Sequence, residues 1–266
     1  MLPTRLAARF VVLVWCATAV ACAGALTPPR AQSKPDNADA LLILPGFGYG
    51  RSGEHVLQSL APAIAAEGLD LFVPTYIARG GLVKSRANLQ RFMQEQHLDR
   101  YERLHVFAFL AGAWTFNPAA EGSAIPNLTT VVYDRSPFQE RAPRIADEAL
   151  HFWAWVRFGS VVFDVARTPY VPLTSPGVKV GIAVETVPTS FVRDHEAVAK
   201  SYGPLTFDCD QFRQHYDDCM YLPFNHDQIY VQFAAVLPEL LAFIKHSRFT
   251  PEANRTAPAG DPWIRK

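Results

Sequence analysis

Short apolar runs alternate with amphipathic stretches along this chain, and that alternation constrains the fold more than any other feature. Residues 41–44 form the first such run, which ends at Pro45 and Gly46 and therefore favours a buried strand over a helix. Similar runs cover residues 69–73, 104–109, 129–133 and 178–184. Strands that alternate with helical stretches predict an α/β fold, a mainly parallel sheet with helices on both faces.

Helices are predicted in three places between and after these strands. The first follows Ser52, a residue type that caps helices, and ends at Gly68. A second covers residues 88–96. The third covers residues 229–246 and is interrupted or restarted at Pro238.

The N-terminal residues 1–25 have the basic start, apolar run and small-residue end of an export signal. Cleavage after Ala23 or Ala25 is one interpretation. The other is lipidation of Cys22, because small and aliphatic residues precede it as in bacterial lipoproteins. We therefore predict an exported protein, periplasmic or extracellular, with a membrane-anchored lipoprotein as the second interpretation.

The rest of the chain fits one domain, residues 40–247, preceded by a polar linker at 26–39 and followed by a flexible tail at 248–266. The chain has 25 basic and 25 acidic side chains, so its composition does not favour a nucleic-acid partner. An insertion at 137–177 is rich in aromatic residues. It is interpreted as a cap over a ligand pocket, a lipid-contacting surface, or simply part of the core.

Two cysteines, Cys209 and Cys219, remain outside the signal. In an oxidising compartment a close pair predicts a disulfide that closes a short acidic loop. A metal site that includes His215 and His226 is the alternative, but the spacing fits no standard zinc pattern. We predict the disulfide and neither a metal nor a cofactor.

Residues 41–50, residues 104–113 and a late histidine, His226, together resemble the α/β-hydrolase family over residues 40–247. The resemblance implies that the turn at Gly46 supplies an oxyanion-hole amide, the N–H of Phe47, and that Ala111 supplies the second. Pro45 stands where the family usually has a histidine.

The family's nucleophile lies in the motif G-x-S-x-G, which this chain replaces with Ala108-Phe109-Leu110-Ala111-Gly112. Small residues remain on both sides, so the sequence predicts that the tight strand-to-helix turn is preserved. Leu110 occupies the serine position and has no lone pair to attack a carbonyl. The covalent acyl-enzyme route is therefore closed at this position.

The resemblance places His226 as the family's histidine, on a loop before the last helix. A structural or solvent-facing histidine is the alternative. Asp227, the next residue, is interpreted as a cap of the helix that starts near Gln228.

Asp134 is our candidate for the acid that orients the histidine, because it follows the strand at 129–133. Its alternative is an ion pair with Arg135 or Arg141. Glu185 comes too early for the family's usual acid position and Asp194 too late.

These residues predict an exported protein that has lost serine-hydrolase chemistry and binds a small acyl or apolar ligand or a protein partner. One alternative is an active hydrolase for ester or lipid-type substrates in which His226 is a general base. A second alternative is a lipid-anchored interaction module held through Cys22.

Overall fold

The computed structural model describes residues 36–122 and 125–264. The predicted signal at 1–25, with Cys22, and most of the predicted linker lie outside the described residues. Within the described part, no helix is both long and apolar enough to span a bilayer.

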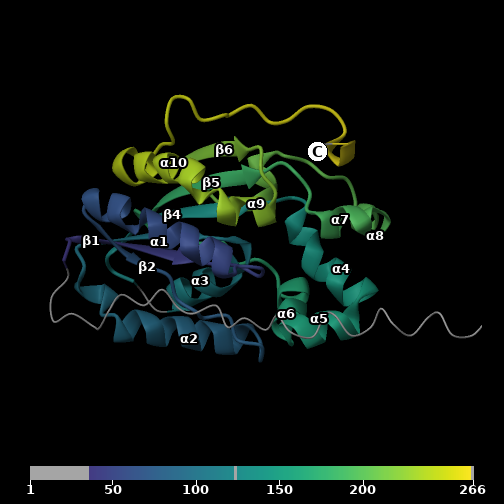
Figure 1. Ribbon diagram of the computed structural model, residues 1–266, viewed down its shortest axis with the longest axis horizontal. Coiled ribbons are helices and arrows are strands. Elements are labelled where there is room, and N and C mark those ends of the chain that lie inside the picture. Colours follow the sequence, from purple (N-terminus) through teal and green to yellow (C-terminus); the bar gives the residue numbers. More distant parts are fainter. Residues whose placement is uncertain (1–35, 123–124, 265–266) are drawn as a thin grey trace, which may run out of the picture.

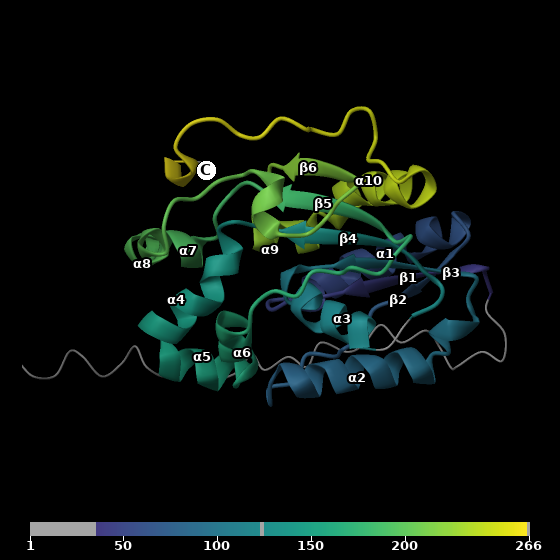
Figure 2. The ribbon, with the colours of Figure 1, turned by 180° about the vertical axis from the view of Figure 1, so that it is seen from behind.

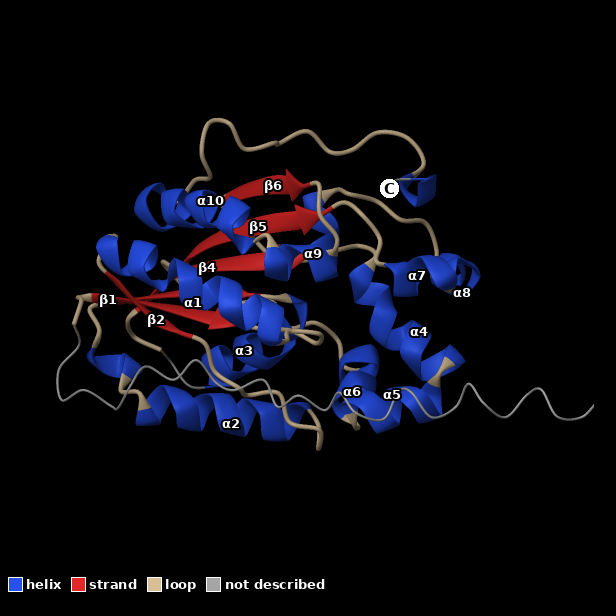
Figure 3. Cartoon of the chain, viewed as in Figure 1, coloured by secondary structure: helices blue, strands red, loops and turns tan. Residues whose placement is uncertain are grey.

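A single six-stranded sheet forms the centre of the molecule (Figures 1 and 3). All neighbouring strands are parallel and the spatial order is β2-β1-β3-β4-β5-β6. The strands are β1 (Asp39–Leu44), β2 (Leu69–Phe72), β3 (Arg103–Ala108), β4 (Leu128–Arg135), β5 (Lys179–Glu185) and β6 (Asp218–Leu222). The predicted parallel α/β fold is confirmed.

Helices cover both faces of the sheet (Figures 1 and 2). The α-helices are α1 (Arg51–Ala66), α2 (Leu82–Glu95), α3 (Leu110–Gly122), α4 (Ala142–Ala149), α5 (His151–Phe158), α6 (Val161–Arg167), α7 (Ser190–Asp194), α8 (Glu196–Ser201), α9 (His226–Val231) and α10 (Phe233–His246). Short 3₁₀ turns lie at η1 (Leu98–Arg100), η2 (Gln139–Arg141), η3 (Cys209–Phe212) and η4 (Pro262–Ile264).

The alternation of side chains along each strand explains the two layers. Leu42 and Leu44 of β1 pack with α2 and α3 on one face, whereas Leu41 and Ile43 pack with α1 and α10 on the other. Because both faces of the parallel sheet are covered, its strands are continuously apolar rather than alternating. This is why short apolar runs located most of them in the sequence.

Several boundaries differ from the predictions. Gly50, not Ser52, is the N-cap of α1, with no side-chain cap, whereas Gly68 does end the helix region with a positive φ of 80°. The final helical stretch is interrupted at Gln232, and Pro238 lies inside α10. A proline six residues into a helix that restarts at Phe233 costs one hydrogen bond without ending it.

Strand β6 was missed because its sequence looks like part of an acidic loop. It is only five residues long and pairs in register with β5, Cys219 opposite Ile182. Cys219 forms the predicted disulfide with Cys209. The disulfide therefore ties the loop before β6 to the edge of the sheet.

The insertion at 137–177 folds into α4, α5 and α6 beyond the carboxyl ends of the strands (Figure 1). The tail, which we expected to be flexible, makes specific contacts over its described residues. Phe249 is buried in the core layer of α10, Arg255 forms an ion pair with Asp218 at 2.7 Å, and the ring of Trp263 packs edge-on against Phe138. These contacts cover the β6 edge of the sheet.

Candidate functional site

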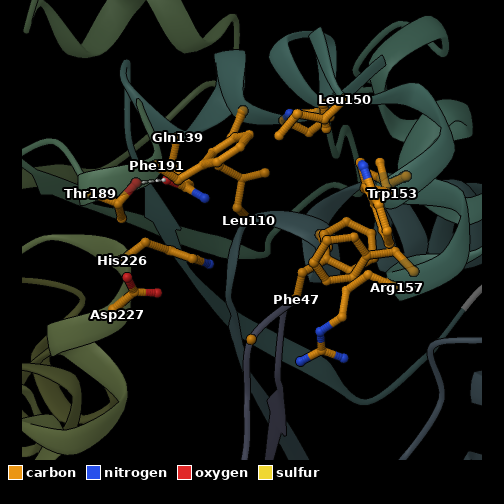
Figure 4. A pocket seen from close by; sticks show the side chains of 18 residues that line it. Phe47, Leu110, Gln139, Leu150, Trp153, Arg157, Thr189, Phe191, His226 and Asp227 are labelled. Atoms are coloured by element: carbon orange, nitrogen blue, oxygen red, sulfur yellow. Dashed lines mark hydrogen bonds between the residues drawn. The ribbon is translucent and has the colours of Figure 1, made fainter. Parts of the chain in front are cut away.

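A cavity of about 380 Å³ lies above the carboxyl ends of the strands, between the sheet and the inserted helices (Figure 4). Its floor includes Leu110 at the start of α3 and His226 at the start of α9. Its wall is formed largely by apolar side chains of α4, α5 and α6, and Trp153 and Arg157 of α5 lie on the side opposite His226. The inserted helices therefore form the cap that the sequence offered as one interpretation.

Leu110 begins α3 without the strained backbone expected for a nucleophile turn. Among the described residues, only His97, Arg213 and Ser247 combine a side chain with positive φ, so Leu110 does not. The carbonyl of Phe109 accepts hydrogen bonds from the N–H groups of Gly112 and Ala113, as at the start of an ordinary helix. The predicted tight strand-to-helix turn is present, because only Phe109 separates β3 from α3, but Leu110 has no positive φ.

Gly112 is nevertheless needed by the packing of α3 against the sheet. A Cβ atom there would lie 2.9 Å from the carbonyl oxygen of Leu44 and 3.4 Å from Cβ of Ala108. The small-residue pattern around Leu110 therefore reflects a close helix-to-strand contact.

His226 is fixed by the start of α9. The side chain of Asn225 accepts hydrogen bonds from the N–H groups of Asp227 and Gln228, and the Gln228 side chain returns a bond to Asn225, a complete capping box. Asn225, not Asp227, is thus the cap, and Asp227 lies exposed at the cavity. His226 is only 4% exposed.

Two carboxyl groups approach the same nitrogen of His226. Nδ1 lies 2.9 Å from Oε1 of Glu185 and 3.5 Å from Oδ2 of Asp134. Both acids come from the carboxyl ends of neighbouring strands, and β4 pairs with β5 so that Asp134 lies opposite Ala183. Because side chains alternate along a strand, Glu185, two residues beyond Ala183, lies on the same face as Asp134.

Asp134, our sequence candidate, therefore lies beside His226, but the hydrogen bond is made by Glu185, which we had set aside. The side chains suggested as ion-pair partners of Asp134 are engaged elsewhere. Arg135 pairs with Glu140 at 2.7 Å, and Arg141 donates to backbone carbonyls of residues 199–204. The alternation in β5 was the signal that would have identified Glu185, but only once the pairing of β4 and β5 was known.

The other nitrogen of His226 faces Tyr230, a residue that the sequence analysis did not select. The Tyr230 hydroxyl lies 3.3 Å from Nε2 of His226, accepts the N–H of Gly46 at 3.0 Å, and lies 3.3 Å from the carbonyl oxygen of Phe47. The Tyr230 ring also stacks on Phe109 at 4.5 Å. A hydroxyl has one proton, and the carbonyl of Phe47 can only accept it.

This geometry places a proton on Nε2 of His226. If Tyr230 donates to Phe47, its oxygen accepts from Gly46 and from an N–H at Nε2 of His226. The contact between Nδ1 and Glu185 needs one further proton, which either the imidazole or the carboxyl group of Glu185 can hold.

The electrostatics of the cluster favour a charged imidazole. Burial opposes charge on His226, but the nearby carboxyl groups of Glu185 and Asp134 outweigh it and raise the pKa of His226 to about 10. Burial, with the repulsion of Asp134, raises the pKa of Glu185 to about 8. At neutral pH both shifts favour the protonated forms of His226 and Glu185.

Several buried oxygens of the two acids lack a donor in the described part of the chain. Both oxygens of Asp134 and Oε2 of Glu185 have no hydrogen-bond partner among the described residues. The two acids and His226 bring three potential metal-ligand atoms within 4.8 Å of one another.

Two of the three predicted oxyanion residues line the cavity, and the third is engaged elsewhere. Phe47 and Ala111 both line it, next to Leu110. The N–H of Gly46 is occupied by Tyr230. Phe47, Leu110, Ala111 and His226 therefore all line one largely apolar chamber.

Solved structures with the same arrangement of strands and helices include Est1E from Butyrivibrio proteoclasticus, with a TM-score of 0.52 at 15% identity over 80% of this chain and 89% of that chain. The mature form of the lipase BlEst2 from Bacillus licheniformis gives a TM-score of 0.50 at 12% identity over 80% of this chain and 96% of that chain. Comparison with protein-family models gives no match, and comparison with curated proteins gives none either. The chain has the α/β-hydrolase fold.

Proposed function

We propose that this chain is an exported α/β-hydrolase-fold protein that binds a small apolar or acyl ligand without serine-hydrolase chemistry. The observation that carries the proposal is Leu110, an aliphatic side chain at the point where α3 meets the floor of the cavity. An apolar chamber with few polar groups is the usual form of a small-molecule site.

The chemistry of His226 supports binding rather than turnover. A general base must accept a proton at the operating pH, and an imidazole with a pKa of about 10 is already protonated. Its Nε2 also faces the hydroxyl of Tyr230. The hydrolase alternative that uses His226 as the base is therefore the weaker of the two.

A reactive-probe experiment tests the loss of chemistry. The purified protein is treated with a fluorophosphonate, which modifies activated serine, threonine or cysteine nucleophiles, and is analysed by mass spectrometry. We expect no modification of a residue that lines the cavity. Stoichiometric labelling there would overturn the non-catalytic part of the proposal.

A cavity-filling pair tests the binding part. Ala146 lines the cavity, whereas Ala149, one turn further along α4, is exposed. With 1-anilinonaphthalene-8-sulfonate as the fluorescent probe, Ala146→Phe is expected to weaken binding by about tenfold, or ~1.4 kcal/mol. Ala149→Phe is the matched control and is expected to leave it unchanged. Equal behaviour of the two variants, or no probe binding by the unmodified protein, would contradict a ligand cavity.

A further inference from the structure

The outer face of the cap concentrates the exposed apolar side chains of the molecule. Seven large hydrophobic residues are exposed among those described, and five of them belong to α5 or to the start of α2. We call these five the aromatic face: Val83, Phe152, Trp153, Trp155 and Val156, which are 44–78% exposed. Single exposed hydrophobics are ordinary, but a contiguous group marks an interaction surface.

Helices α5 and α2 are joined at this face by direct contacts. The guanidinium of Arg79, just before α2, donates hydrogen bonds to the carbonyls of Trp155, Val156 and Arg157 at the end of α5. The N–H of Leu82, the first residue of α2, donates to Asp164 of α6 at 2.9 Å. Figures 1 and 2 both show α2, α6 and α5 along the same side of the molecule. The aromatic face therefore has a fixed backbone frame.

The charged side chains of this face are mainly basic. Lys84 and Arg91 of α2 and Arg157 of α5 are exposed, α5 contains no carboxylate, and the one carboxylate of α2, Glu95, lies at its far end. Two other basic side chains are engaged with backbone carbonyls, Arg79 with those of α5 and Arg86 with that of Trp114. The nearby acids are engaged as well, Asp164 with the N–H of Leu82 and Asp147 with Arg167. Three exposed cations thus lie on the helices that carry the exposed tryptophan and phenylalanine rings.

We propose that the aromatic face docks on an anionic phospholipid surface. Aromatic rings with an apolar body partition into the interfacial region of a bilayer, and neighbouring Lys and Arg side chains are attracted to anionic headgroups. The mainly basic charge complements such a surface. A neutral protein partner offers the rings an apolar contact but leaves the three exposed cations, Lys84, Arg91 and Arg157, without counter-charges.

The position of Trp153 and Arg157 adds a functional consequence. Both residues also line the cavity (Figure 4), so the docked face lies at the wall of the ligand chamber. An apolar molecule can then pass from the bilayer to the cavity without crossing water. Only this consequence rests on the proposed ligand cavity; docking itself does not.

Vesicle sedimentation tests the docking. All proteins carry Cys22→Ser, so that no lipid on that residue acts as an anchor, and vesicles consist of phosphatidylcholine alone or of equal parts phosphatidylcholine and phosphatidylglycerol. We expect binding to the anionic vesicles, a blue shift of tryptophan emission, and loss of both at high salt. Phe152→Ser combined with Trp155→Ser is expected to weaken binding by about tenfold or more.

Two further variants separate the apolar and charged contributions. Val156→Ser is compared with Val231→Ser, a similarly exposed valine on α9 outside the face. Only Val156→Ser should lower vesicle binding. Lys84→Gln is expected to weaken binding to anionic vesicles by roughly fivefold and to leave binding to neutral vesicles unchanged.

Three outcomes would overturn the proposal. The first is that the folded protein with an unsubstituted aromatic face sediments with neither kind of vesicle. The second is an equal loss in Val156→Ser and Val231→Ser. The third is a concentration-dependent dimer, seen by light scattering, that the Phe152→Ser, Trp155→Ser protein abolishes while vesicle binding is unaffected, which would assign the face to a second copy. None of these measurements depends on a ligand in the cavity.

Discussion

The start of α3 and the start of α9 face the same cavity, but their side chains differ completely in character. At the start of α3 the side chain that lines the cavity is that of Leu110, whose backbone has no positive φ. At α9, His226 is held by Glu185, Asp134 and Tyr230 in a buried polar cluster. Oxygens of Asp134 and Glu185 have no hydrogen-bond partner among the described residues, so the stability of this buried cluster depends strongly on His226.

The largest effect is expected from removing the cation of this cluster. His226→Leu leaves two buried carboxyl groups without their shared partner and should lower the free energy of unfolding by about 3–5 kcal/mol. Urea denaturation followed by circular dichroism measures it. His246→Leu, an exposed histidine at the end of α10, is the control and should change stability by less than about 0.5 kcal/mol. If His226→Leu lowers the free energy of unfolding by no more than the control does, charge on His226 does not stabilise the cluster.

A smaller loss is expected on the α3 side of the comparison. Gly112→Ala forces a methyl group to within 2.9 Å of the Leu44 carbonyl oxygen, so α3 must shift, at about 1–3 kcal/mol. Gly122, at the other end of the same helix, has open space around it and is the matched control. Gly122→Ala should be neutral or stabilise by up to about 1 kcal/mol. If both substitutions stabilise, the close contact under Leu110 is not the reason for the glycine.

The pH dependence of stability sharpens the assignment of protons. Because the pKa of Glu185 is raised from 4.5 to about 8, the folded protein keeps a proton that the unfolded chain loses across that window. Stability is therefore greatest below pH 4.5 for this group and declines as the pH rises toward 8, by about 1.4 kcal/mol per pH unit for one proton. His226 adds a decline of the same sign between 6.5 and about 10.

Glu185→Gln removes the first decline and reduces the second, because Glu185 makes the largest contribution that raises the pKa of His226. Between about pH 5 and 6 the variant should show a flatter unfolding midpoint, while the unmodified protein loses stability. Thermal unfolding at fixed ionic strength measures both. The raised pKa of Glu185 is contradicted if the two proteins have the same slope in this window.

The smallest effect is expected from restoring a serine at position 110. Leu110→Ser should give no hydrolysis of p-nitrophenyl butyrate above buffer, because His226 is protonated and its Nε2 faces Tyr230. Initial rates at several pH values check this, with the unmodified protein as the control. A serine-dependent rate would mean that His226 is free to accept a proton, and the contrast between the two sides of the cavity would then disappear.

Much of the scaffold followed from local sequence. Five of the six strands coincide with apolar runs, because strands buried on both faces must be apolar throughout. The disulfide followed from the close cysteine pair. Strand β6 was not predicted, because this five-residue edge strand contains Asp218 and Cys219 and has no such apolar run.

The site was predicted less completely because its contacts join distant parts of the chain. His226 and Asp134 were identified by their order along the chain, but the bond to Glu185 spans 41 residues and the bond from Gly46 to Tyr230 spans 184. No local spacing encodes such pairs. The register of β4 and β5 places Glu185 on the same face as Asp134, and the return of α9 places Tyr230 beside Gly46.

Residue types at fixed local spacing were enough to predict a parallel α/β sheet and to place Leu110 at the motif position where the family has its serine. The fold placed Glu185 and Asp134 beside Nδ1 of His226 and Tyr230 beside Nε2. Local spacing does not encode these neighbours, because parallel strands and a returning C-terminal helix bring them together from across the chain, and the pKa of the histidine depends on burial and on such neighbouring charges.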